Sequence, residues 1–392
     1  MRHVGIICEY NPFHGGHEYL LRQVREAQTV ICVMGGCFTQ RGEAAILPPT
    51  LRAEMALACG ADLVLELPFP YACGSARYFA TAGVRAVQGL GADMLAFGSE
   101  CADLERLRAV AQRTLASDLE EKAANGMKKE GLAAAYFNTL GENELPPNDI
   151  LAVEYLRAVL QGGEQLAVYP VKRVGAGYHD VESEGAFPSA TALRTMLKRE
   201  EDISKALPVK AQSAWQRGVT EWGVADIRRL GDAMLAALRL MDVQRGKRPL
   251  TGCENADLGD LGGGLAERLV HASRTATDYD SLCADAATKK YTNGRIRRAL
   301  VYLMAGVTRE DLLAPPAYLR LLGANEKGRE FLANTRKTRT VPVVTKPADI
   351  KALGECAVRA HDLERIAQGL YALCTPRPTA PSALATLSPI LL

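Results

Sequence analysis

Two histidines three residues apart, His14 and His17, stand in the segment EYNPFHGGHEYLL, residues 9–21. A short apolar run, HVGIIC, precedes this segment, and a helical pattern begins within it. A helix start presents free backbone N–H groups and the positive end of the helix dipole, which favours phosphates. Gly15 and Gly16 let a flat ligand approach the backbone closely. The segment therefore predicts a nucleotide site in which histidine donors stabilise phosphate charge during in-line displacement. The alternative is a helix cap with two incidental histidines.

A second segment with suitable side chains is PSATALRTML, residues 188–197. Ser189 and Thr191 offer hydroxyl groups, Arg194 offers a positive charge, and a helix start offers further N–H donors. Taken alone, this pattern is typical of a serine-capped helix with a surface arginine. The functional interpretation is that this segment supplies a second part of the nucleotide site.

Short apolar runs separated by helical patterns must position these side chains. The runs are rich in Val, Ile and Leu and cover residues 3–9, 29–34, 61–67, 93–98 and 167–172. Strands that alternate with helices indicate a parallel sheet covered on both faces. We therefore predict an α/β fold with a doubly wound parallel sheet over residues 1–200. In such a sheet, ligands bind beyond the carboxyl ends of the strands, where the histidine segment begins.

The second half of the chain has a different pattern. From about Ser204 the strand signals nearly vanish and helical periodicity dominates, which predicts a mainly α-helical domain over residues 201–375. The last residues, 376–392, are rich in Pro, Ala and Ser and predict a flexible tail.

Composition narrows the class of protein. No run of 18 or more apolar residues is free of charges or breaks, and Glu9 interrupts the apolar start, so we expect a cytoplasmic protein without a membrane segment. The 10 cysteines form no C-x-x-C pair, so neither a metal site nor a disulfide framework is expected.

Charge is distributed unevenly between the two halves of the chain. Residues 1–200 carry 19 Lys/Arg and 24 Asp/Glu, whereas residues 201–392 carry 28 Lys/Arg and 21 Asp/Glu. This asymmetry favours a phosphate-bearing partner for the second half.

The histidine segment resembles the HxGH signature of the nucleotidylyltransferase and class I aminoacyl-tRNA synthetase superfamily. A closer resemblance, to the bacterial tRNA(Met) cytidine acetate ligase family, rests on motifs spread over nearly the whole chain. These motifs are VGIICEYNPFHGGH, GGCFTQRGEAAI, DLVLELPFPYACGSARYFA, AFGSE, PPNDILAVEYL, VKRVGAGYHD, SATALR, LLGANEKGREFL and VPVVTKP. The resemblance implies a ligase that activates acetate with ATP as acetyl-adenylate. The implied second step transfers the acetyl group to the exocyclic amine of the wobble cytidine of elongator tRNA(Met).

Carried over by motif, the resemblance implies catalytic roles for His14 and His17 and an ATP site built from four parts of the chain. The implied ATP-binding residues are Ile7, Cys8, Glu9, Tyr10, Asn11, Pro12, Phe13, His14, Gly15, Gly16, His17, Glu18, Tyr19, Leu20, Gly98, Asn148, Arg173, Ser189, Thr191 and Arg194. By itself, Gly98 also fits a simple turn, Asn148 a helix cap, and Arg173 a surface charge. The TQRGE segment after the second predicted strand also faces this site, but the sequence gives Gln40, Arg41 and Glu43 no firm role.

Transfer to a tRNA base requires a surface that holds the phosphate backbone. Two basic segments, residues 289–303 and 325–339, interleave Lys and Arg with Tyr291, Tyr302 and Phe331. The alternative is that these are amphipathic helices with Tyr302 and Phe331 in the core and the charged side chains in water. The candidate tRNA contacts are Lys289, Lys290, Arg295, Arg297, Arg298, Arg336, Lys337 and Arg339.

Two other functional readings compete with the ligase. The first is an adenylyltransferase that acts on a small phosphorylated cofactor precursor, but such an enzyme has no need of a basic helical half. The second is a non-catalytic RNA-binding protein on the same fold, against which the intact HGGH and SATALR motifs argue. For the ligase we expect ATP as a substrate with Mg²⁺, acetate and elongator tRNA(Met) as reaction partners, and no stable protein partner.

Overall fold

The computed structural model describes residues 2–115, 145–163, 165–174, 187–243, 258–385 and 387–392. In the first half, strands and helices alternate as the sequence predicts. Its strands are β1 (His3–Cys8), β2 (Thr29–Gly35), β3 (Leu63–Leu67), β4 (Met94–Ser99) and β5 (Ala167–Lys172). Its helices are α1 (Gly15–Gln23), α2 (Pro49–Ala58), α3 (Ala76–Leu90), α4 (Leu104–Leu115), α7 (Pro147–Gln161) and α8 (Ala190–Lys198).

The five strands of the first half are parallel and lie in the order β5-β4-β1-β2-β3. The chain thus builds the sheet outward from β1 in one direction and then returns to add β4 and β5 on the other side of β1. This reversal leaves a crevice beyond the carboxyl ends of β1 and β4, where ligands of open α/β sheets bind. The histidine segment follows β1 directly, so the topology places it at that crevice.

Helices cover both faces of the sheet, which confirms the predicted doubly wound architecture. Strand β3 shows the cause, because its side chains alternate between two apolar cores. Leu63 and Leu65 pack with α3, α4 and α7 on one face, whereas Val64 packs with α1, α2 and α9 (Val209–Glu221) on the other.

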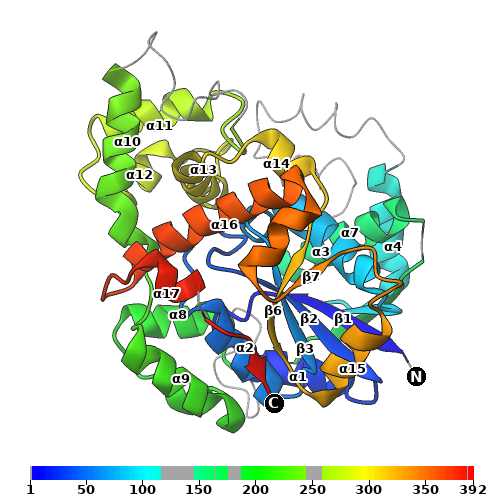
Figure 1. The fold of residues 1–392 in the computed structure, drawn as a ribbon. Coiled ribbons are helices and arrows are strands. Elements are labelled where there is room, and N and C mark those ends of the chain that lie inside the picture. The colour runs from blue at the N-terminus through cyan, green and yellow to red at the C-terminus, as the bar shows by residue number, and fades with distance from the viewer. Residues whose placement is uncertain (1, 116–144, 164, 175–186, 244–257, 386) are drawn as a thin grey trace.

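Most helices of the second half pack into a further apolar core, which also takes in Cys37, Phe38 and Phe69 from loops of the first half (Figure 1). The remaining helices of the second half are α10 (Gly231–Val243), α11 (Leu265–Ser273), α12 (Tyr279–Ala286), α13 (Asn293–Ala305), α14 (Arg309–Leu313), α15 (Glu326–Asn334), α16 (Glu355–Cys374) and α17 (Pro381–Ala385). Tyr302 and Phe331 are buried, so the core reading is correct for both aromatic side chains. Among the described residues, no helix is long and apolar enough to span a membrane.

The second half is mainly helical, as predicted, but it also contributes strands to the sheet. Strand β6 (Leu319–Ala324), which was not predicted, pairs antiparallel with β3 and extends the sheet, followed by β7 (Val343–Val344). The segment 376–392, expected to be a flexible tail, contains α17 and β8 (Ile390–Leu391), and β8 pairs with β6. The sheet therefore draws strands from both halves of the chain. The backbone hydrogen bonds of β6 hold the end of the chain in place.

Candidate active site

His14 and His17 are fixed by the start of α1. His14 is the N-cap residue, and its Nδ1 accepts a hydrogen bond of 3.0 Å from the backbone N–H of Gly16. His17 reaches back, and its Nδ1 accepts a hydrogen bond of 3.3 Å from the backbone N–H of His14. The two imidazole rings therefore stack, with their centroids 3.8 Å apart. This reciprocal arrangement is a capping box, so the sequence reading as a helix cap is correct, and it also holds the two rings side by side.

The same hydrogen bonds determine the charge and the tautomer of both rings. Burial is the main cause that lowers the pKa of His14 to about 3, and the positive charges of Arg173 and Arg194 lower it further. Burial, His14 and Arg173 likewise hold the pKa of His17 well below its ordinary value. Both rings are thus neutral at pH 7. Because each Nδ1 is an acceptor, the proton of each ring resides on Nε2. Each histidine therefore offers one N–H donor, and no hydrogen bond among the described residues uses it.

Most other side chains of the segment 7–20 build the floor of the site. Ile7, Cys8, Tyr10 and Phe13 are buried in the apolar cores on either side of β1, so only their backbone can face a ligand. Pro12 and Gly15 are also buried, and the Phe187 ring lies directly over Gly15. The half-buried residues are Gly16, Glu18, Tyr19 and Leu20, and they lie on α1 with His17.

The loop after β4 forms a second wall. Gly98 lies on β4 beside Arg173, whose side chain passes within ordinary contact distance of the place where a Cβ would stand. Asn148 Nδ2 donates a hydrogen bond of 2.5 Å to Glu100 Oε1. The neighbouring Asp149 is buried and accepts hydrogen bonds from Ser99 Oγ (2.5 Å), Glu100 N (2.8 Å) and Cys101 N (3.1 Å). Asp149 therefore shapes the turn that carries Gly98 toward the site, a role that the sequence did not reveal.

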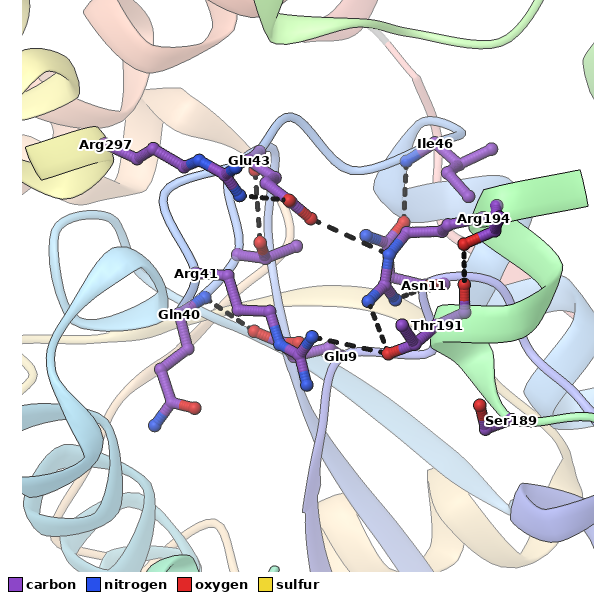
Figure 2. Close-up of polar contacts among 12 residues, drawn as sticks. Glu9, Asn11, Gln40, Arg41, Glu43, Ile46, Ser189, Thr191, Arg194 and Arg297 are labelled. Carbon is purple, nitrogen blue, oxygen red and sulfur yellow. Dashed lines mark hydrogen bonds and ion pairs between the residues drawn. The ribbon is translucent and has the colours of Figure 1, made fainter. Parts of the chain in front are cut away.

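Helix α8 brings the second motif against the first. Ser189 is the N-cap residue of α8 and accepts a hydrogen bond of 3.2 Å from Ala192 N, so the capping reading is correct for this serine. Arg194 donates hydrogen bonds to the Asn11 backbone oxygen (2.8 Å) and to Thr191 Oγ1 (3.1 Å). Asn11 Oδ1 in turn accepts a hydrogen bond of 2.7 Å from Ile46 N. The two motifs, separated by about 180 residues, therefore form one polar network (Figure 2).

Three residues without a firm role in the sequence join this network from the loop after β2. Gln40 N donates a hydrogen bond of 2.6 Å to Glu9 Oε1, and Arg41 Nη1 donates one of 3.4 Å to Thr191 Oγ1. Glu43 Oε1 lies 2.6 Å from Arg297 Nη1, and Glu43 Oε2 lies 3.7 Å from Arg194 Nε. Figure 2 shows Arg41 and Glu43 directed toward Thr191 and Arg194 of the second motif, whereas the Gln40 side chain points away. The position of this loop after a strand was the only sequence signal for its function.

The buried Arg52 on α2 ties the loops of the site to one another. Its guanidinium donates to the backbone oxygens of Glu9 (2.5 Å), Gly35 (3.0 Å) and Leu47 (3.0 Å), and also to that of Gly36. The ends of β1 and β2 thus share one fully buried cation. Five donors in a planar fork make arginine well suited to this position.

Comparisons with known proteins agree with this geometry. Residues 1–383 match the family model described as HIGH Nucleotidyl Transferase. The chain is 39% identical over 367 residues to the tRNA(Met) cytidine acetate ligase of Syntrophotalea carbinolica, covering 88% of this chain and 85% of that protein. It is 31% identical to the protein of the same name from Acetivibrio thermocellus, covering 96% of both. The chain belongs to the tRNA(Met) cytidine acetate ligase family. The crystal structure of Thermotoga maritima TmcAL bound with alpha-thio ATP superposes with a TM-score of 0.85 at 29% identity, covering 100% of both chains.

Within this family framework, the structure separates the basic residues into three groups. Arg297 and Arg298 on α13 face the catalytic half, because Arg297 pairs with Glu43, and Arg298 pairs with Asp260 (2.7 Å) and donates to the Gln40 backbone oxygen (3.3 Å). Lys289, Lys290 and Arg295 lie just before or within the first turn of α13. Lys290 and Arg295 donate to backbone oxygens of residues 260–263, whereas Lys289 is exposed.

The third group, Arg336, Lys337 and Arg339, follows α15 and lies at the other edge of the sheet. Thr340 N donates a hydrogen bond of 2.8 Å to the Gly89 backbone oxygen, and Gly89 lies near the end of α3, before β4 begins. This is the amino edge of the parallel strands, whereas the histidines lie at the carboxyl edge. The structure therefore does not bring this group together with the α13 residues.

Proposed function

We propose that this chain is an ATP-dependent ligase that activates acetate as acetyl-adenylate and acetylates N4 of the wobble cytidine of elongator tRNA(Met). The observation that carries the proposal is the pair of neutral histidines, each with an unused Nε2–H, at the switch point of the sheet. Paired donors at a helix start suit the phosphates of a nucleotide. The names of the 31–39% identical relatives and the ATP analogue named with the Thermotoga maritima structure support it further.

The reaction divides into two steps. An acetate oxygen attacks the α-phosphorus of ATP, the bond to the β-phosphate oxygen breaks, and diphosphate leaves. His14 and His17 donate to phosphate oxygens as charge builds on them, and Arg173 and Arg194 add positive potential. In the second step the cytidine amine attacks the acetyl carbonyl carbon, and AMP leaves with the electron pair of the broken C–O bond. The anhydride is already activated, so no covalent enzyme intermediate is needed.

We propose that Mg²⁺ enters as a complex with ATP. No group of three or more His, Cys, Asp or Glu side chains in the described ranges is arranged to hold a metal ion. In nucleotide sites Mg²⁺ is held largely by phosphates and water, which requires no such cage. The ion would supply charge neutralisation on the phosphates.

For tRNA, the α13 residues are the group that adjoins the site. Gly42 has a φ of +69° and packs against the backbone of Arg297 and Arg298, so the loop after β2 contacts α13 directly. We propose that Lys289, Lys290 and Arg295 bind the tRNA backbone close to the site, where an unstacked wobble base can reach the adenylate. Arg336, Lys337 and Arg339 would contact a different part of the tRNA. Because its substrate is tRNA, we place the enzyme in the cytoplasm.

The test is an acetyl-transfer assay with labelled acetate, ATP, Mg²⁺ and bulk bacterial tRNA. Parallel reactions omit tRNA, omit ATP, or replace acetate with labelled acetyl-CoA. The proposal expects label in tRNA from acetate only when ATP is present. Absence of transfer from acetate would contradict the ligase, and transfer from acetyl-CoA alone would contradict the adenylate step. Charge reversal of Lys289 and Lys290 should reduce the slope of tRNA affinity against salt concentration.

A further inference from the structure

The acetyl-transfer step releases a proton that the two-step reaction does not place. When the cytidine N4 attacks the acetyl carbonyl carbon, a C–N bond forms and the C–O bond to AMP breaks. The nitrogen must then lose one proton to give a neutral amide. A side chain that accepts this proton needs a free lone pair within reach of the reacting atoms. This inference rests on the proposed function.

The two histidines cannot accept this proton. The Nδ1 lone pairs of His14 and His17 are occupied by backbone N–H donors, and each Nε2 already carries a hydrogen. An imidazole in this state donates hydrogen bonds but has no vacant lone pair. The proton acceptor must therefore be sought among the carboxylates that surround the site.

Three of these carboxylates are already engaged. Glu43 contacts two arginines, Arg297 at 2.6 Å and Arg194 at 3.7 Å, which stabilise its negative charge. Asp149 accepts three hydrogen bonds from the turn after β4. Glu100 accepts from Asn148 through Oε1, and its Oε2 is closed off from solvent.

Glu9 differs from these three residues in geometry. It is the first residue after β1, so the topology points its loop into the crevice. Its Oε1 accepts the Gln40 N–H at 2.6 Å, which fixes the carboxylate, whereas no hydrogen bond or ion pair among the described residues uses Oε2. Figure 2 shows the Glu9 carboxylate next to the Arg41 side chain, whose Nη1 donates to Thr191 Oγ1 of the second motif. We propose that Glu9 is the general base that takes the N4 proton through Oε2 during acetyl transfer.

The charged groups that face Glu9 come from three elements. They are Arg41 from the loop after β2, Arg194 from α8 and Arg52 from α2. Burial is the largest influence and raises the pKa of Glu9 above its ordinary value, while the Gln40 N–H and these three arginines lower it. A carboxylate with a raised pKa is a stronger base than an exposed one, and the surrounding cations favour its ionised form. The proton passes from Oε2 to solvent once the product leaves.

The experiment separates the two steps of the reaction. Acetyl-adenylate is first formed on the enzyme without tRNA and quantified. tRNA is then added under single-turnover conditions, and the rate constant for transfer from the bound adenylate is measured between pH 5 and pH 9. The variants are E9Q, which keeps the acceptor for Gln40 but cannot take a proton, and E9D, which keeps a shorter carboxylate. E26Q, at an exposed position after α1, is the matched control.

In wild type, the transfer rate constant should rise with pH through the titration of Glu9 and then level. In E9Q the transfer rate constant should fall about 100-fold or more, beyond any loss in adenylate formation. Its rise with pH at the acidic end of the range should also disappear. E9D should restore part of the transfer rate constant together with its rise with pH. An E9Q enzyme that transfers the acetyl group from its adenylate at the wild-type rate would overturn the role of Glu9. An E9Q enzyme whose transfer rate constant still rises with pH as in wild type would do the same. If wild type itself forms no adenylate from acetate, the failure lies in the proposed function.

Discussion

Glu43 and Arg297 form an ion pair of 2.6 Å that joins the loop after β2 to α13. The other oxygen of Glu43 lies 3.7 Å from Arg194, so one carboxylate links the basic helix to the second nucleotide motif. The side chains are only partly exposed, 29% for Arg297 and 21% for Glu43, so solvent screens the pair incompletely. Arg297 is therefore placed to support the loop after β2.

We expect R297M to impair adenylate formation even when no tRNA is present. Loss of Arg297 frees Glu43 to shift, and Arg194 then loses a fixed partner at the nucleotide site. Acetate-dependent exchange of labelled diphosphate into ATP should fall roughly tenfold, because small misplacements of charged groups near a phosphate are costly. R309M, an exposed arginine at the start of α14, is the control.

A double-mutant cycle makes this expectation specific. If the ion pair carries the effect, E43Q combined with R297M should cost much less than the sum of the two single variants. Additive losses would show that the two residues act independently. Normal exchange in R297M with weakened tRNA binding would restrict Arg297 to the RNA surface.

The second prediction concerns the acid sensitivity of the fold. The pKa of His14 is lowered to about 3 in the folded protein, against an ordinary value near 6.5 in the unfolded chain. Between these values the unfolded chain binds more protons, so the stability from this residue is complete above about pH 6.5 and is lost as the pH falls. The free energy of unfolding should therefore drop by about 2 kcal/mol more in wild type than in H14Q between pH 7 and pH 5.

Urea unfolding at several pH values measures this difference. Groups that titrate in both proteins cancel, which leaves the contribution of His14. Parallel pH dependences in wild type and H14Q would mean that the histidine is not held neutral by burial.

Local patterns predicted the first half of the fold well and the second half less well. The strands β1 to β5 lie within two residues of their predicted ranges because each is a continuous apolar run in a parallel sheet. Strand β6 was missed because its six residues, LRLLGA, pair with β3 about 250 residues earlier, and strand propensity depends on such partners. Two prolines before this run, Pro315 and Pro316, were an available sign that the helical pattern had ended.

The candidate site likewise combines residues that local patterns reveal with residues whose roles depend on distant contacts. His14, His17 and Arg194 could be proposed as site residues from the sequence because their motifs carry their own helix starts. The roles of Glu43 and Asp149 depend on partners far away in the chain, which no local pattern reveals. Arg297 and Arg298 had the composition of an RNA surface, but their charges are largely satisfied within the protein.

The third prediction concerns the turn after β4. D149A should leave the Ser99 hydroxyl and the N–H groups of Glu100 and Cys101 without their acceptor, at a cost of about 1–3 kcal/mol. The affinity for ATP should fall as well, since the turn carries Gly98. D149N keeps one oxygen acceptor and should lose less of both. Thermal unfolding and calorimetric titration with ATP would measure these effects, and equal losses in D149A and D149N would contradict the acceptor role.

The last prediction concerns Arg52, the buried cation that joins the strand ends. R52M has a similar volume but removes every donor, so four backbone oxygens lose their partner in a site closed to water. We expect a loss of about 3 kcal/mol or more in the free energy of unfolding, because each buried carbonyl left without a donor costs about 1–3 kcal/mol. R52K keeps the charge without the planar fork and should fall between wild type and R52M.

Denaturant unfolding of these variants tests the expectation, with R309M as the control for loss of an arginine. At a temperature where R52M remains folded, its acetate-dependent diphosphate exchange should also fall, because Arg52 holds the backbone oxygen of Glu9. A variant that loses less than about 1 kcal/mol would show that water or a shifted backbone satisfies the carbonyls. Lost stability with unchanged exchange would mean that Arg52 supports the fold without setting the position of Glu9.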